Sequence, residues 1–193
     1  MPDPAPSDDK DRQLQEQYEK AMRQSRIVID PKTQAEIRSA ALPEMKALAK
    51  AALAVRMFEE TLPKYNDVPP NSVDNTRLTE EQKKQHENLV KGNNDAHDKL
   101  RAVVAEKNKD KKWFDTSKLD GRDRVDVAAQ RLLNESYYAA EIKAGKKEFV
   151  EKVAPEYVKE ATLLAALLDD EGGKGTTIPG KPKAPAKEKR MDR

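Results

Sequence analysis

The chain contains no cysteine and only two histidines, His86 and His97. The absence of cysteine excludes a disulfide framework, a thiolate metal site and a cysteine nucleophile, and it suits a reducing compartment. The histidines are eleven residues apart, about 16 Å along one helix, so they cannot bind the same metal ion from that helix. We therefore predict no metal site, and we interpret both histidines as partly buried side chains at helix contacts.

Long apolar runs are also missing. The first nine residues, MPDPAPSDD, have neither a basic region nor an apolar one, so they do not form a signal peptide. The longest apolar run covers residues 161–168 and is far shorter than the ~20 residues that a membrane span needs. The sequence thus predicts no membrane span and a cytoplasmic location, with later incorporation into a particle or export by a dedicated system left open.

Large apolar side chains are scarce. Leu, Ile, Val and Phe together make about 18% of the 193 residues, while charged residues make 37% and the net charge is only +2. Alanine is the commonest apolar residue, and it buries little area at roughly 25 cal/mol per Å². An alanine-rich core allows close helix packing with modest stabilisation. The sequence therefore predicts an all-α fold, either a thin helical bundle or elongated antiparallel helical hairpins.

The chain divides into a helical domain at 9–171 between two polar ends. The Pro-rich segment 1–8 and the Gly-, Pro- and Lys-rich segment 172–193 are predicted to be disordered. Capping and proline signals, such as Thr79 with Gln82, give about four to six helices inside the domain. The expected helices cover 9–26, 31–65 with a kink or break at Pro43, 79–107 with a possible break at Gly92, 122–153 and 155–171.

Apolar residues recur at steps of three and four in the long segments, which is the spacing of a coiled-coil-like helix contact. One such series runs from Ala41 to Leu62 and is interrupted only by Glu59. A second runs from Val125 to Val153 and includes two polar positions. These series fit either an intramolecular core or a contact between subunits. The first helix carries one shorter apolar stripe on an otherwise charged surface: Leu14, Tyr18 and Met22.

No pattern of catalytic residues stands out. Neighbouring carboxylates such as Glu59 and Glu60 point about 100° apart on a helix and do not face each other. The segment 172–177, GGKGTT, lacks the spacing of a phosphate-binding loop and precedes no predicted helix. We predict no enzyme, no cofactor and no small-molecule substrate, and we keep an enzyme of unrecognised type as an alternative.

Two segments are candidates for an interface. Residues 161–168 are apolar nearly all round a helix, so they are either buried on several sides or docked on a partner. Residues 107–114 combine four lysines with two aromatics at the end of the segment and could contact nucleic acid, but we favour packing of the two aromatics onto the bundle. The candidate residues are Leu163, Leu164, Leu167, Leu168, Trp113 and Phe114.

The C-terminal segment is basic. Residues 174–193 contain seven Lys or Arg against two acids. Such a tail can bind an acidic protein, nucleic acid or an anionic membrane, or it can simply keep the protein soluble, and the sequence leaves both interpretations open. The tail residues proposed for contact are Lys181, Lys183, Lys187, Lys189 and Arg190.

Together these features favour a non-catalytic helical protein that works through protein–protein interaction or assembly, as an adaptor or as a structural subunit of a larger complex. The expected partner is another protein or a second copy of the chain. A nucleic-acid-associated protein that uses the basic tail and the 107–114 segment is the main alternative. Detection of nucleic acid co-purifying with the chain in a salt-dependent manner would favour that alternative.

Overall fold

The computed structural model describes residues 6–65 and 72–169 of the chain. The described part is all-α, as predicted, and the segment 172–193 with its candidate basic residues lies outside it. The α-helices are α1 (Pro6–Ser25), α2 (Pro31–Ala40), α3 (Leu42–Glu59), α4 (Glu80–Lys111), α5 (Leu119–Lys143), α6 (Lys147–Val153) and α7 (Val158–Leu167), with short 3-10 helices at Asn75–Arg77 and Pro155–Tyr157. None of the described helices is long and apolar enough to cross a membrane.

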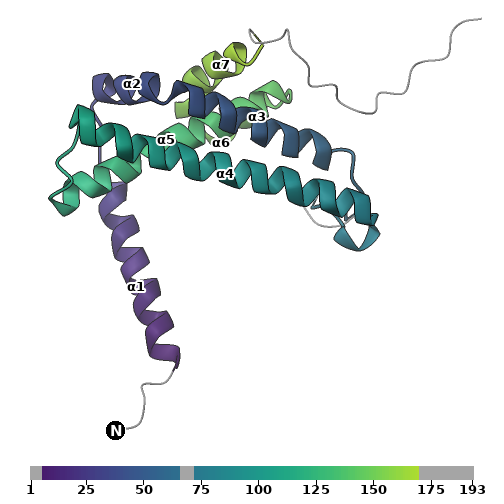
Figure 1. The fold of residues 1–193 in the computed structure, drawn as a ribbon, viewed down its shortest axis with the longest axis horizontal. Coiled ribbons are helices and arrows are strands. Elements are labelled where there is room, and N and C mark those ends of the chain that lie inside the picture. Colours follow the sequence, from purple (N-terminus) through teal and green to yellow (C-terminus); the bar gives the residue numbers. More distant parts are fainter. Residues whose placement is uncertain (1–5, 66–71, 170–193) are drawn as a thin grey trace, which may run out of the picture.

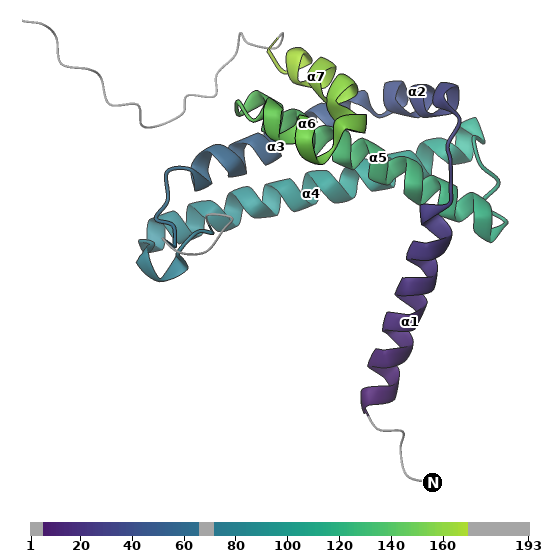
Figure 2. The same cartoon turned by 180° about the vertical axis from the view of Figure 1, so that it is seen from behind.

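Helix α5 lies at the centre of the bundle. Helices α3 and α4 form an antiparallel pair, and α5 packs against both of them and against α7 (Figure 1). Helices α6 and α7 lie together beside α5, as the view from behind in Figure 2 shows. In both views α1 stands away from this bundle. The architecture is therefore a small helical bundle with one projecting helix.

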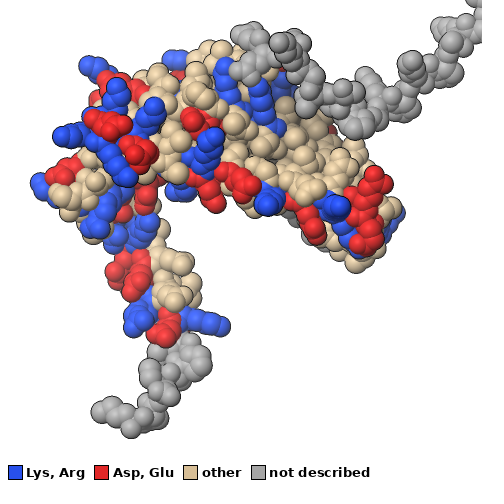
Figure 3. Space-filling view, viewed as in Figure 1, with Lys and Arg blue, Asp and Glu red and all other residues tan. Residues whose placement is uncertain are grey.

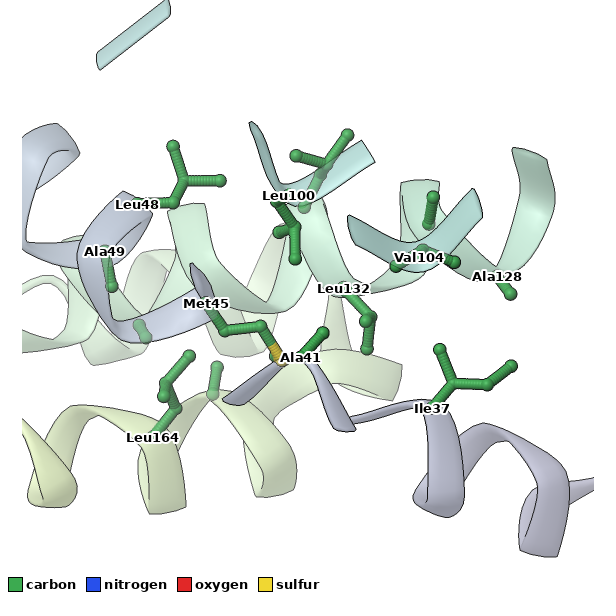
Figure 4. Close-up of a cluster of buried hydrophobic side chains, with 14 of the residues drawn as sticks. Ile37, Ala41, Met45, Leu48, Ala49, Leu100, Val104, Ala128, Leu132 and Leu164 are labelled. Carbon is green, nitrogen blue, oxygen red and sulfur yellow. The ribbon is translucent and has the colours of Figure 1, made fainter. Parts of the chain in front are cut away.

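The core is formed by a few large side chains separated by alanines (Figure 4). Met45 and Leu48 of α3 meet Leu100 of α4 and Leu132 of α5, and all four are at most 1% exposed. Alanines in the same cluster leave little side chain between neighbouring helices, so the backbones come close and the large residues interdigitate. The buried alanines of this cluster are Ala41, Ala49, Ala128, Ala129, Ala139, Ala161 and Ala165.

The predicted helix at 31–65 is two helices, and it ends earlier than predicted. The break falls at Ala41, just before Pro43, as expected for a proline that cannot continue the preceding helix. Helix α3 then ends at Glu59 rather than near Tyr65. Pro63 follows four residues later and disfavours helical backbone in the residue before it, which explains the shorter helix.

The predicted helix at 122–153 is also interrupted. At Gly145 the backbone adopts a positive φ of 83°. The Lys146 N–H donates to the Glu141 carbonyl at 2.9 Å and the Gly145 N–H donates to the Ile142 carbonyl at 3.0 Å. This pair of bonds is a Schellman motif, which ends a helix. The predicted continuation of the contact series was therefore wrong: Phe149 and Val153 are 50% and 49% exposed.

Helix α4 shows the opposite deviation, because it is longer than predicted and has no break at Gly92. Its first turn carries both hydrogen bonds of the predicted capping box between Thr79 and Gln82. Gly92 lies on the exposed side of the helix, where its small helix-breaking tendency is overcome by the packing of the turns on either side.

A charged pair crosses the bundle at Glu135, one of the two polar positions of the 125–153 series. Arg38 of α2 donates two hydrogen bonds, of 2.8 and 2.7 Å, to the carboxylate of Glu135 in α5. These bonds raise the pKa of the Arg38 guanidinium above its usual value, and the negative charges of Glu135 and Glu160 act in the same direction. Bidentate geometry of this kind satisfies a buried carboxylate, so Glu135 fits within an otherwise apolar contact.

The turn between α4 and α5 is held by specific contacts. The Asn108 side chain accepts a hydrogen bond from the Phe114 N–H at 2.9 Å and donates one to the Phe114 carbonyl at 3.0 Å. Gly121 lies against the backbone of Asp115, and a Cβ atom at this glycine would come within 1.9 Å of the Asp115 carbonyl oxygen. Only glycine fits at this position without displacement of the turn.

Two glycine-to-alanine substitutions should therefore have opposite effects. We expect Gly121→Ala to lower the free energy of unfolding by about 1–3 kcal/mol, the usual cost of overpacking. Gly92→Ala meets no atom within 4 Å and should raise it by about 0.5–1 kcal/mol through helix propensity. Urea unfolding followed by circular dichroism measures both, and equal effects of the two variants would contradict this account of the turn.

Candidate functional site

The most distinctive surface of the molecule is the apolar stripe on α1. The three large apolar side chains of this helix are exposed to solvent: Leu14 by 64%, Tyr18 by 63% and Met22 by 41%. They follow one another at intervals of four residues, so they lie on one face of the helix. We call Leu14, Tyr18 and Met22 the α1 stripe.

Helix α1 is joined to the bundle through polar side chains. Arg23 Nε donates to Asp123 Oδ2 at 3.1 Å, and Lys20 Nζ lies 2.9 Å from Asp126 Oδ2. Gln24 Nε2 donates to both carboxylates at 3.3 Å. Asp123 is itself 4% exposed, so the α5 end of this contact is buried. These charge-assisted bonds fix the C-terminal half of α1.

The contact with α5 uses the side of α1 opposite to the stripe. At 100° per residue, Lys20, Arg23 and Gln24 lie roughly 120–160° around the helix from Tyr18. In Figure 3, Lys, Arg, Asp and Glu atoms lie along one edge of the middle turns of α1, and other residues lie along the opposite edge. An amphipathic helix normally turns its apolar side toward the core. Here the polar side of the last turns makes the contact with α5, and the apolar stripe takes no part in it.

The segment after α1 anchors the helix to the bundle. Ile29 is 3% exposed and belongs to the core cluster. Arg124 Nη1 donates to the Val28 carbonyl at 3.2 Å. Ile29 and the two carboxylates of α5 thus fix the C-terminal end of α1. Because that end is fixed, the stripe stays away from the rest of the molecule.

The apolar run at 161–168 is largely part of the core. Leu164 is 4% exposed, while Leu167 and Leu168 are half-buried. Leu163 alone points to solvent, with 56% of its surface exposed. The four leucines therefore do not form one exposed patch, and only Leu163 is available on the surface of α7.

The two aromatics at the end of α4 also face inward. Trp113 and Phe114 are partly buried and pack against the core cluster. Among the lysines of this segment, Lys109 lies 2.8 Å from Glu106, which raises the pKa of its ammonium group through a hydrogen bond and through charge. The rings thus occupy the position favoured by the sequence analysis, on the bundle rather than on an exposed platform for nucleic-acid bases.

One small cavity of about 250 Å³ lies between α3, α4 and α5. Its charged groups are paired: Arg56 Nε lies 3.5 Å from Glu141 Oε1, and His86 Nε2 lies 2.8 Å from Glu59 Oε1. Both histidines are partly buried, with side chains 21% and 30% exposed. Within the described residues, no group of three or more His, Asp or Glu side chains is placed to hold a metal ion.

Comparisons of the chain with protein-family models, with curated proteins and with solved structures find no match. A functional interpretation therefore depends on the geometry of the chain itself. Within that geometry, the α1 stripe combines high exposure with an orientation that the fold of the bundle does not explain.

Truncation of the α1 stripe should leave stability almost unchanged. Because these side chains are exposed, we expect Leu14→Ala and Tyr18→Ala to change the free energy of unfolding by less than about 0.5 kcal/mol. Leu100→Ala, at a position that is 0% exposed, should lower it by about 2–5 kcal/mol. A large loss of stability in the stripe variants, measured by urea unfolding, would show that the stripe is buried within the monomer.

The buried carboxylate of Asp123 should hold α1 against α5. Replacement by asparagine removes a charge-assisted hydrogen bond worth about 1.5–3 kcal/mol. We expect Asp123→Asn to speed amide exchange in residues 22–27 by roughly 10- to 100-fold, with α4 unaffected. Asp126→Asn, whose side chain is 42% exposed in the parent, should have a smaller effect in the same hydrogen-exchange experiment, and the reverse order would contradict the role assigned to Asp123.

Proposed function

We propose that this chain is a non-catalytic interaction or assembly protein and that α1 is its docking element. The observation that carries the proposal is the orientation of α1, which places its polar side on α5 and its apolar stripe toward solvent. Exposed apolar residues in a row are typical of surfaces that bind another protein. A helix that presents such a row resembles the ligands of helix-in-groove recognition.

The composition of the chain supports the same proposal. Large apolar residues are few, and most of those described in the bundle are used in its core. Three of them stand on a helix that is held by ion pairs and contributes no large side chain to the core cluster. Exposing them in this way has no benefit for the stability of the monomer, whereas it offers a partner a surface of about two helical turns.

The packing of Trp113 and Phe114 against the core weighs against nucleic-acid binding by the 107–114 segment. Stacking of bases requires exposed aromatic faces. The basic residues of the C-terminal tail lie outside the described residues, so their part in that alternative stays a prediction from sequence.

The docking role can be tested by photocrosslinking in the cells that produce the chain. A photoreactive amino acid is placed at Tyr18 in the stripe and, as a matched control, at Glu16, which is exposed and lies roughly 160° away around the helix. We expect discrete protein adducts from position 18 and not from position 16, with the partner identified by mass spectrometry.

Failure of position 18 to form a discrete adduct, or equal adducts from both positions, would contradict the proposal. Circular dichroism of both variants confirms that they fold, which the exposure of the two positions leads us to expect. The same spectra separate a failure of docking from a failure of folding.

A further inference from the structure

Helix α1 has little tertiary support before its last turns. Every residue from Asp9 to Arg23 is exposed to solvent, and the helix stands clear of the bundle in both views (Figures 1 and 2). Its ion pairs and hydrogen bonds to α5 come from Lys20, Arg23 and Gln24. The stretch from Asp9 to Glu19 is therefore a helix that buries none of its side chains.

The side-chain bonds inside this stretch are local and exposed. Arg12 Nη2 lies 3.0 Å from Asp9 Oδ1, and the two side chains are 69% and 67% exposed. Gln15 Nε2 donates to Glu19 Oε1 at 2.9 Å. Pairs of this kind favour an isolated helix by less than about threefold each. Because good helix formers predominate and neither Gly nor Pro occurs in residues 7–25, the helix and coil states of the stretch lie close in free energy.

A helix with so little support depends on where its first turn forms. Formation of that turn is unfavourable by a factor of roughly 10⁻³, whereas each further residue is close to neutral. The contact with α5 supplies such a turn, because Arg23 and Gln24 both bond to the carboxylate of Asp123, which is 4% exposed. We call Lys20, Arg23 and Gln24, together with Asp123 and Asp126, the α5 joint. A helix that starts at the joint extends toward the N-terminus without a second nucleus.

We propose that the α5 joint nucleates α1, that residues 9–19 exchange between helix and coil in the free chain, and that docking completes the helix. The part of this inference that concerns docking rests on the proposed function. It names what controls access to the docking site, because Leu14 and Tyr18 share one face only while the stretch is helical. The affinity for a partner then scales with the helical fraction of the free chain.

Helix α4 is the contrasting case within the same molecule. It buries Leu100 and Val104, which are 0% and 1% exposed, and it continues through Gly92 without a break. Opening of α4 would expose the core, so its helix is lost only when the bundle unfolds. Opening of residues 9–19 exposes nothing that was buried, which places α1 at the low-stability end of the structure.

Carbon chemical shifts of the full chain measure the helical population residue by residue. We expect this population to be highest at residues 21–25 and to decline toward Asp9, falling below about half at residues 9–12. Helix α4 should be helical throughout. A population that stays above about nine-tenths from residue 9 to residue 24 would overturn the inference, since unsupported ends fray. Coil over all of these residues would overturn it as well.

A glycine substitution tests the equilibrium without touching the α1 stripe or the α5 joint. Glycine disfavours helix about four- to fivefold relative to alanine. Gln17 is exposed, and we expect Gln17→Gly to lower the helical population of residues 9–16 at least about twofold, with Gln17→Ala raising it. The matched control is Gln85→Gly at an exposed position of α4, where packing should keep the helical population of α4 unchanged. Equal responses of the two helices would overturn the inference.

The role of the joint as the nucleus is tested from the α5 side. Asp123→Asn should lower the helical population of residues 10–19, which precede the joint, because the first turn is then less stable. A helix that formed independently of α5 would keep its population in this variant. Parent-like chemical shifts at residues 10–19, together with faster amide exchange at residues 22–27, would therefore overturn the assignment of the joint as the nucleus.

The inference and the proposed function can fail separately. With the photoreactive amino acid at position 18, Gln17→Gly should lower the adduct yield at least about twofold and Gln85→Gly should not; an unchanged yield would overturn the coupling of docking to helix formation. A fully helical α1 with a discrete adduct would refute the exchange and keep the docking role. A gradient of helical population without an adduct would refute the docking role and keep the exchange.

Discussion

Scarcity of large apolar side chains is the constraint on which this structure depends. The bundle meets it by placing alanines at the closest helix contacts and by concentrating the large residues around α5. Met45, Leu48, Leu100 and Leu132 are thereby almost completely buried, and each contributes more stabilisation than the same residue would in a loosely packed core. Polar residues that fall within the contacts are satisfied by partners, as Glu135 is by Arg38. The core is small and has few residues that could be exchanged without loss.

Against that constraint, the exposure of the three apolar residues of α1 supports the proposed docking role. They are held away from the bundle by a contact made of carboxylates, a guanidinium, an ammonium and an amide. Such a contact has a defined direction, because hydrogen bonds and ion pairs depend on geometry more than apolar packing does. The bundle therefore does more than support α1: it fixes which side of the last turns of the helix faces α5.

Much of the fold could be predicted because its signals are local. The capping box at Thr79, the proline near Ala41 and the three–four spacing of α3 each depend on neighbouring residues, and each appears in the structure. The end of α5 was missed because Gly145 can either continue a helix or end it, and the choice depends on the hydrogen bonds of the surrounding turn. The stripe on α1 is visible in the sequence, but its direction is not. That direction depends on Arg23 meeting Asp123, 100 residues away, which no periodicity reveals.

The continuous helix of α1 also determines how far its apolar face stands from the bundle. Because Ile29 and the α5 carboxylates fix one end, the reach of the stripe depends only on the number of residues in the helix. Insertion of seven residues between Tyr18 and Lys20 would move Leu14 and Tyr18 outward by about 10.5 Å with almost the same facing direction and leave Met22 in place. Insertion of two residues at the same point would instead turn Leu14 and Tyr18 by about 160° around the helix. The length of α1 is thus a spacer that can change without turning the apolar face only by steps close to whole numbers of turns, such as seven or eleven residues.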